Sequence, residues 1–281
     1  MYKLKDNLLK LINKIFNKKN SKIESLTPTQ SEKLLNEITS SGIIKNFERE
    51  INNGLNIVKL DSLYGKKLGT EKYIYNLPLA SKLSESQTIS LAKQFFTSLV
   101  TELSDKANRV LSGEDSQFKF VFEKYGQSLD RNGNPREAEV TDFSEVYCPI
   151  RGDLRDLYSV VHEVTHTFDL SNGDTEARKI FGEIAPQCME RMLDEYLLSL
   201  SDGDIQKYGL DRNILMQDVR NRQLSTFLSR KDNIKSFNND TGNKELDLRY
   251  ILAQIYSSKY MKLDKNTRTS EEYRIKWYHL L

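Results

Sequence analysis

The segment "SVVHEVTHTFDL", residues 159–170, constrains the fold of this chain more than any other stretch. It holds two of the chain's three histidines, His162 and His166, four residues apart. On an α-helix these positions lie on one face about one turn apart, so both imidazoles can bind one ion. Apolar residues at helical spacing form an adjacent stripe: Leu154, Leu157, Val161, Val164 and Phe168. The pattern predicts a helix with one face packed on a core and the neighbouring face lining a cleft.

Glu163 directly follows the first histidine, and this completes an HExxH motif. In such a motif the carboxylate can take a proton from a metal-bound water. The alternative is an ordinary helix with two surface or core histidines, because HExxH also arises by chance. Here the motif contains no helix breaker, and a purely structural metal site needs no carboxylate beside its ligand. We therefore interpret the segment as a catalytic metal site and expect Zn²⁺ as the cofactor.

A catalytic zinc site needs a third protein ligand. A histidine six residues after His166 would indicate the metzincin class, but that position is Asn172, so this class is excluded. Glu176 follows soon after the motif helix and stays a candidate ligand. Asp169 shares the face of the two histidines, where it would support a ligand by hydrogen bonding.

The next predicted helix offers a better third ligand. It has a ladder of polar residues down one side, namely Glu183, Gln187, Glu190 and Asp194. A solvated charged face is the simplest alternative interpretation of such a ladder. If the short "SNGD" turn lets the two helices pack antiparallel, Glu183 approaches the histidine pair. The sequence therefore favours His162, His166 and Glu183 as metal ligands.

"HEVTH" followed by "FGEIAPQCME" resembles the thimet oligopeptidase and oligoendopeptidase F family of zinc peptidases. In that family a glutamate ligand follows HExxH, and a second glutamate stands seven residues later, as Glu183 and Glu190 do here. "EVYCPIRGDLRDLYSVVHEVTH" resembles the family's edge strand, loop and motif helix, and "LRYILAQIYSSKYM" resembles its tyrosine-bearing helix. The resemblance covers residues 145–261. It implies a zincin-like fold, a general base at Glu163 and a Tyr250 hydroxyl that hydrogen-bonds the developing oxyanion.

The chain departs from the family pattern at several positions. Thr165 stands where the family has a glycine, and Pro186 lies one residue later than the family's proline. Asn243 and Asn238 occupy the positions of a tyrosine and a substrate-side histidine. The chain is also much shorter than typical members, so a cut-back substrate channel would either admit a protein substrate or leave a narrow specificity.

The segments before the motif predict a small antiparallel β-hairpin. "FKFVFEKYG" alternates as a strand does, "DRNGNP" is rich in turn formers, and "REAEVTDFSEVYCPI" can return as a second strand. Upstream, "ESQTISLAKQFFTSLVTELSDKANRVLSG" predicts one long helix that stops at Gly113. We expect a mainly α protein with a small antiparallel β-hairpin or sheet next to the active-site helix, an α+β, zincin-like fold. The predicted domains are a basic amphipathic helix at 1–25, a helical region at 26–115 and a catalytic region at 116–281.

Composition limits the partners and the cellular compartment that we expect for the protein. The formal charge of +2 provides no field that would recruit nucleic acid, and two cysteines make no disulfide framework. No apolar run approaches the roughly 20 residues that span a bilayer, and "MYKLKDNLLKLINKIFNKKNSK" is no signal peptide. We expect a cytoplasmic protein, although a specialised secretion system can export such a chain. The basic N-terminal helix either docks on its own domain or makes a weak contact with an anionic membrane surface.

The sequence thus predicts a zinc metalloendopeptidase or oligopeptidase that acts on a peptide or protein substrate. An interaction module, such as a secreted effector or adaptor that keeps zinc without turnover, is the alternative from another class. The basic N-terminal helix and the missing family contacts favour that alternative, whereas the intact Glu163 opposes it. A zinc hydrolase of a non-peptide amide is weaker, because "VYCPI" lacks the motif that a deformylase-like cysteine ligand requires.

Overall fold

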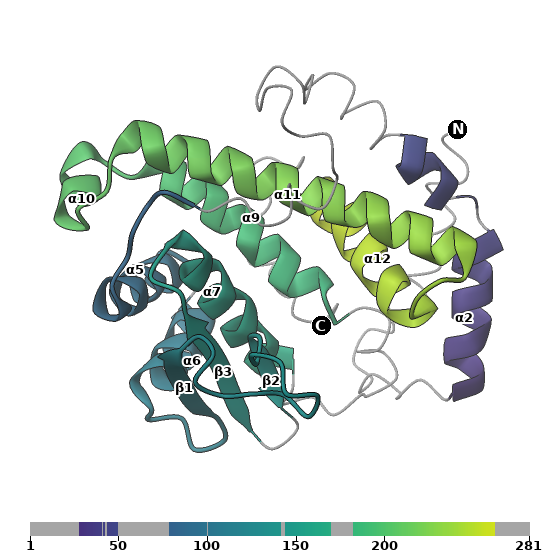
Figure 1. The fold of residues 1–281 in the computed structure, drawn as a ribbon, viewed down its shortest axis with the longest axis horizontal. Coiled ribbons are helices and arrows are strands. Elements are labelled where there is room, and N and C mark those ends of the chain that lie inside the picture. The colour runs from purple at the N-terminus through teal and green to yellow at the C-terminus, as the bar shows by residue number, and fades with distance from the viewer. Residues whose placement is uncertain are drawn as a thin grey trace. The chain divides into compact units, whose positions relative to one another are not determined.

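The computed structural model describes residues 28–40, 42, 44–49, 79–99, 101–141, 144–169 and 182–261. These residues form mainly helices with one small sheet (Figure 1), as the sequence predicts. The chain divides into two compact units. The sheet unit comprises Lys72–Asn172 and Ala185–Thr226, and the terminal unit comprises Met1–Glu71, Gly173–Ile184 and Phe227–Leu281. The predicted helix at 1–25 lies outside the described residues, and the domain boundaries at 25 and 115 stay predictions.

The sheet has three strands, β1 (Lys119–Lys124), β2 (Glu139–Thr141) and β3 (Glu145–Ile150), in the order β1-β3-β2. β3 runs parallel to β1 and antiparallel to β2, so the predicted hairpin between the first two segments is wrong. The second segment turns at Ser144, whose φ is 67°, and so yields two strands. Its more apolar half, β3, takes the central position between β1 and β2. There Val146, Tyr147 and Cys148 are fully buried.

Two helices, α5 (Glu85–Thr97) and α6 (Thr101–Ser112), replace the single long helix that the sequence predicts. The hydroxyl of Ser98 donates to the carbonyl of Phe95, and the N–H of Leu99 donates to the carbonyl of Phe96, which tightens and ends the last turn of α5. The break lets both amphipathic halves pack against α7 (Leu154–Asp169). α6 stops at Ser112, and Gly113 follows with a φ of +72°, so the predicted stop is confirmed.

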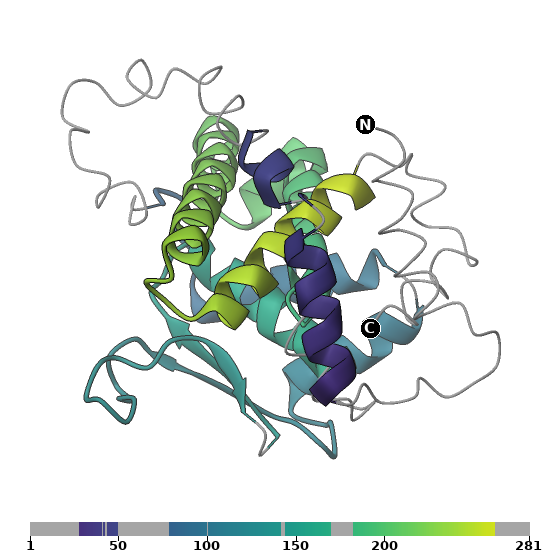
Figure 2. The same ribbon diagram turned by 90° about the vertical axis from the view of Figure 1, so that its right-hand side faces the viewer.

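α7 carries the HExxH motif and packs against β2, β3, α5 and α6. Figure 2 shows these helices on one side of the strands. The predicted apolar stripe is buried along its whole length: Leu154, Leu157, Val161, Val164 and Phe168. Burial of such a stripe is the main contribution that an amphipathic helix makes to stability.

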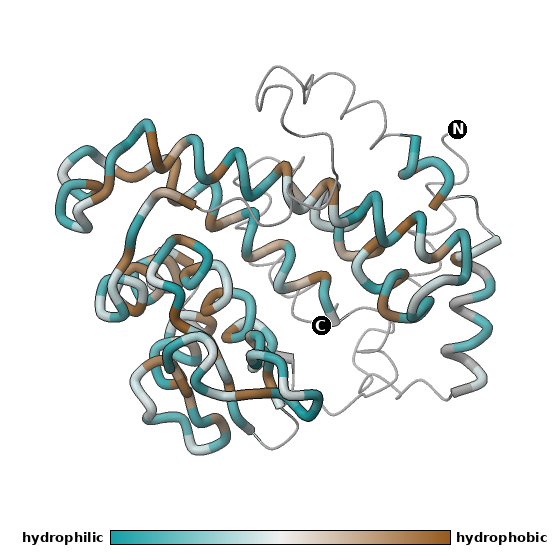
Figure 3. Tube along the Cα trace, in the orientation of Figure 1, coloured by the Kyte–Doolittle hydropathy of each residue, from teal (hydrophilic) through white to brown (hydrophobic). Residues whose placement is uncertain are grey.

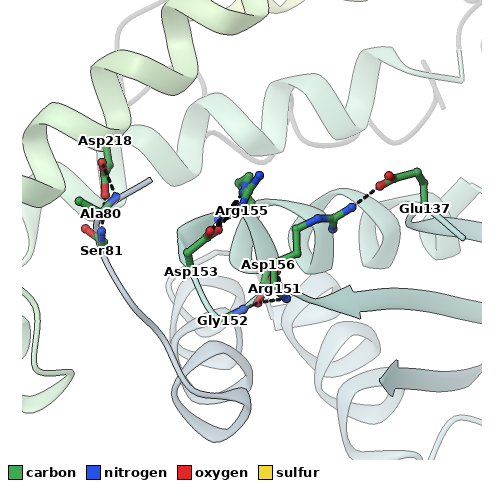
Figure 4. A network of polar contacts seen from close by, with 9 residues as sticks. All are labelled: Ala80, Ser81, Glu137, Arg151, Gly152, Asp153, Arg155, Asp156 and Asp218. Carbon is green, nitrogen blue, oxygen red and sulfur yellow. Dashed lines mark hydrogen bonds and ion pairs between the residues drawn. The ribbon is translucent and has the colours of Figure 1, made fainter. Parts of the chain in front are cut away.

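The turn from β3 into α7 is fixed by two carboxylates (Figure 4). Asp153 caps the helix, because its carboxylate accepts the backbone N–H of Arg155 at 3.0 Å. Asp156, fully buried, accepts the backbone N–H groups of Arg151 and Gly152 at 2.7–3.0 Å. These bonds fix where the motif helix begins relative to the end of the central strand.

The sheet unit is completed by α9 (Ile184–Ser199), α10 (Asp202–Lys207) and the first part of α11 (Arg212–Asn239). Pro186 lies in the first turn of α9, where a missing N–H breaks no helical hydrogen bond. On α11, the Asp218 carboxylate accepts the backbone N–H groups of Ala80 and Ser81 at 3.1 and 2.6 Å (Figure 4). Along the helices hydrophobic and hydrophilic positions alternate (Figure 3), as helices with one buried face require.

In the terminal unit the structure describes α2 (Pro28–Ser40), the second part of α11 and α12 (Lys244–Tyr260). Asn243 caps α12, because its side-chain oxygen accepts the N–H of Leu246 at 3.1 Å. Asn233 of α11 donates to the Asp247 carboxylate of α12 at 2.8 Å. Among the described residues, no helix combines the length and the apolar character needed to cross a membrane.

Candidate metal centre

The two histidines of the motif point at a common location. His162 and His166 lie one turn apart on α7, and their Nε2 atoms are 3.2 Å apart. Two nitrogens bound to one tetrahedral Zn²⁺ at about 2.0–2.1 Å would be separated by about 3.3 Å. The pair is therefore already spaced as two ligands of one ion.

Glu183 completes a group of three potential metal ligands. One ligand atom from each of His162, His166 and Glu183 lies within 4.8 Å of the other two. Glu183 directly precedes α9 and is buried, with 7% of its surface exposed.

Glu163, the second residue of the motif, is also buried, at 6% exposed. Burial first, and then the negative charges of Glu163 and Asp156, raise the pKa of the Cys148 thiol on β3. At its low exposure the Glu163 side chain is largely shielded from bulk water.

Glu190 of α9 orients the first histidine. Its Oε1 lies 2.7 Å from Nδ1 of His162. An ionised carboxylate only accepts hydrogen bonds, so Nδ1 of His162 carries a proton, and in the neutral imidazole Nε2 then keeps a lone pair. That lone pair is directed at the position shared with His166. A hydrogen bond of this kind fixes the tautomer and ring orientation of metal-binding histidines.

A second polar pair joins the same two helices one turn further along. The hydroxyl of Tyr158 on α7 donates to the carboxylate of Asp194 on α9, which also accepts the amide of Gln223 on α11 at 2.9 Å. Tyr158 pairs with Asp194 and His162 with Glu190, so residue numbers rise along one helix as they fall along the other. α7 and α9 are therefore antiparallel, as predicted.

The polar ladder on α9 is not a solvated charged face. Its four members are each between 4% and 8% exposed: Glu183, Gln187, Glu190 and Asp194. Buried carboxylates require hydrogen-bond donors or cations to offset the loss of water. Glu190 and Asp194 have such donors in the histidine, tyrosine, glutamine and arginine side chains around them.

Of the other predicted residues, one belongs to the terminal unit and the rest lie outside the description. Tyr250 lies on α12 in the terminal unit, where the guanidinium of Arg230 stacks over its ring at 4.5 Å. Its predicted role at the oxyanion stays a prediction. Glu176, Asn172 and the "SNGD" turn lie outside the described residues, as does the side chain of Asp169.

Sequence reasoning missed Arg222 and Tyr158. Nη2 of Arg222 on α11 donates to Oε2 of Glu190 at 3.0 Å, and its guanidinium stacks over the ring of Tyr158 at 5.2 Å. Tyr158 could have been found, because it lies four residues before His162 on the same helical face. For Arg222 no local spacing provides such a signal.

Comparison of the chain with protein-family models, with curated proteins and with solved structures finds no match. The chemistry of the site therefore rests on its own residues. Two imidazoles and one carboxylate are a donor set of catalytic zinc sites, which leave one coordination position open. The residues present could hold a divalent metal ion.

Proposed function

We propose that this chain is a zinc-dependent metallopeptidase that hydrolyses peptide bonds of a peptide or protein substrate. The observation that carries the proposal is the convergence of His162, His166 and Glu183 within 4.8 Å, with the buried Glu163 next to the first histidine. A structural metal site would require the three ligands, but it would not require that carboxylate. The proposed relation to the thimet oligopeptidase and oligoendopeptidase F family rests on the sequence motifs.

His162, His166 and Glu183 would hold the zinc, which when bound supplies a Lewis acid and lowers the pKa of a water molecule. Glu163 accepts the proton of the attacking water as the water oxygen bonds to the scissile carbonyl carbon. Glu163 then delivers that proton to the amide nitrogen as the carbon–nitrogen bond breaks. The carboxylate is regenerated, and the products are a carboxylic acid and an amine.

The substrate would lie along an edge of the sheet. β3 ends close to the motif helix, but it is the central strand and pairs with β1 over its whole length, so it is not an edge strand open to a substrate. β2 is an edge strand and contacts α7, so an extended peptide that adds to β2 would run beside the motif helix. In this proposal the Tyr250 hydroxyl donates a hydrogen bond to the oxyanion.

The test compares zinc content and peptide cleavage in the wild-type protein and in Glu163→Gln. We expect about one zinc per chain in both proteins, cleavage within a panel of quenched-fluorescent peptides by the wild type, and no turnover by the variant. The exposed Glu114, changed to Gln, provides the matched control and keeps full activity. Undiminished cleavage by Glu163→Gln would remove this residue from the mechanism.

The panel also decides between hydrolysis and the interaction module. If the zinc-loaded wild type binds peptides and cleaves none of them, the protein is a binding module and the hydrolase proposal fails. If the protein purified from cells grown with ample zinc contains no metal, both the hydrolase and the zinc-binding module are excluded.

A further inference from the structure

Glu190 has two carboxylate oxygens, and each has its own partner. Oε1 bonds to Nδ1 of His162 at 2.7 Å, and Oε2 accepts Nη2 of Arg222 at 3.0 Å. With one partner only, the carboxylate could rotate about its terminal bond, since that torsion is broad. With two partners on opposite oxygens, the plane of the carboxylate is fixed. The direction in which it holds the imidazole is then fixed as well.

Arg222 is itself held in place by contacts with its own helix, α11, and with α7. Its Nη1 donates to Oγ1 of Thr226 on α11 at 2.7 Å, and its planar group stacks over the Tyr158 ring of α7. The planar fork of an arginine fits such a set of directed contacts, whereas a lysine ammonium is a point charge without fixed directions. Arg222 therefore connects α11 both to α7, which carries the histidines, and to α9, which carries Glu190.

We propose that Arg222 is a positioning residue of the metal centre, which fixes Glu190 and through it the ring orientation and tautomer of His162. The inference deepens the proposed function and rests on it insofar as His162 is a metal ligand. Arg222 does not touch the ligand position itself. It acts through the hydrogen bond from Nδ1 of His162 to Glu190.

A purely structural role for Arg222 is the competing explanation. The side chain of Arg222 is 29% exposed, and ion pairs that reach solvent typically contribute little to stability. The three directed contacts of the guanidinium exceed what a loose surface ion pair requires. The two explanations differ in one respect: only positioning makes the effect of Arg222 depend on Glu190.

The experiment measures zinc affinity by competition with a chromophoric chelator in a double-mutant cycle. The variants are Arg222→Met, Glu190→Gln, their combination, and Arg222→Lys. Arg220→Met is the matched control, because Arg220 is exposed on the same helix. Loss of a partner that orients a metal-binding histidine typically costs about 10- to 100-fold in affinity. We expect a loss of about tenfold or more for Arg222→Met, a smaller loss for Arg222→Lys and none for Arg220→Met.

In the combined variant, the zinc affinity should equal that of Glu190→Gln alone, because the glutamine has one acceptor oxygen and no longer links the Arg222 guanidinium to Nδ1 of His162 through two oxygens. If the two losses multiply, or if Arg222→Met binds zinc as tightly as the wild type does, the inference is overturned. Should Arg222→Met fail to fold, the same comparison is made with Arg222→Lys in the two backgrounds.

A second measurement needs no metal. Nitrogen-15 NMR of the metal-free protein at pH 8 reports which ring nitrogen of His162 carries the proton. We expect the Nδ1–H tautomer in the wild type and in Arg220→Met, and a mixture of tautomers in Arg222→Met. An unchanged tautomer in Arg222→Met overturns the inference. If the wild type binds no zinc, the proposed function fails, while the NMR result still decides the role of Arg222.

Discussion

At the scale of single residues, the two nitrogens of His162 have separate partners. Nδ1 bonds to Glu190, and Nε2 faces Nε2 of His166 at 3.2 Å. With Nδ1 protonated, Nε2 of a neutral His162 presents a lone pair to its neighbour. In the proposed centre this lone pair and the buried carboxylate of Glu183 would both bind the cation.

The oxyanion role of Tyr250 depends on the family resemblance more than any other assignment does. Removal of its hydroxyl oxygen tests this role. Tyr250→Phe keeps the ring that stacks with Arg230 and removes only the hydroxyl. Loss of one hydrogen-bond donor to an oxyanion typically lowers kcat by about 100- to 1,000-fold. We expect a loss of this size in kcat from steady-state peptide cleavage, with zinc content unchanged.

The control for this experiment is Tyr256→Phe, which deletes a tyrosine hydroxyl from the same helix. Burial raises the pKa of Tyr256, as expected for a hydroxyl packed inside the unit. If Tyr250→Phe retains the kcat of the wild type, the oxyanion role has to be assigned to another donor.

The spacing of the motif was enough to predict the convergence of the two histidines, because helix geometry alone determines which residues share a face. The same is true of Glu190 and Asp194, whose positions in the ladder were visible along the chain. The contact of Arg222 with Glu190 was not predictable. It depends on how α11 packs beside α9, and no local pattern specifies which helices become neighbours.

At the scale of secondary-structure elements, α7 and α9 are joined by pairs of side chains at successive turns. Tyr158 bonds to Asp194 one turn away from the bond between His162 and Glu190. Burial raises the pKa of Asp194 to about 6, although the hydroxyl of Tyr158 and the amide of Gln223 act to lower it. The pair therefore gives this helix contact a pH dependence of its own.

The sign of that dependence follows from proton binding. The unfolded pKa is near 3.8 and the folded pKa near 6, so between these values the folded protein binds more protons than the unfolded chain. The free energy of unfolding should therefore fall as the pH rises from about 4 to about 6, by at most about 3 kcal/mol. Asp194→Asn, which cannot ionise, should lack this component and still accept the Tyr158 hydroxyl.

Urea unfolding at a series of pH values from about 4.5 to 7.5, with a chelator present to exclude metal binding, measures the difference between the two proteins. The stability of Asp194→Asn relative to the wild type should increase with pH across this range. Parallel curves for the two proteins would contradict the raised pKa.

The sheet shows why strands are easier to predict than their partners. Alternation and turn formers located the strand segments on both sides of the "DRNGNP" turn, but a strand pattern does not say which neighbour it pairs with. β1 and β3 pair in parallel, and the long connection between them in the chain contains β2. The burial of β3, with Val146, Tyr147 and Cys148 fully covered, accounts for its central position only after the packing of α7 is known.

At the scale of the whole molecule, the candidate ligands come from two separate segments of the chain, with the stretch 170–181 between them outside the description. An ion bound by all three would connect the motif helix to the beginning of α9. Ligand binding to the folded state alone stabilises that state by mass action. Metal binding and unfolding are therefore linked, and the linkage can be measured without knowing the substrate.

Zinc at 100 times its dissociation constant should stabilise the protein by about 2.7 kcal/mol, which for a chain of this size corresponds to a rise in Tm of roughly 5–10 °C. Differential scanning fluorimetry with and without zinc, and after chelation, measures this shift.

Glu163→Gln should show the full shift, because Glu163 is not one of the proposed ligands. His166→Ala and Glu183→Ala should show little or none. Equal shifts with Mg²⁺ would contradict a site built from imidazoles, since that ion prefers oxygen ligands. A full shift in Glu183→Ala would exclude this carboxylate from the coordination sphere.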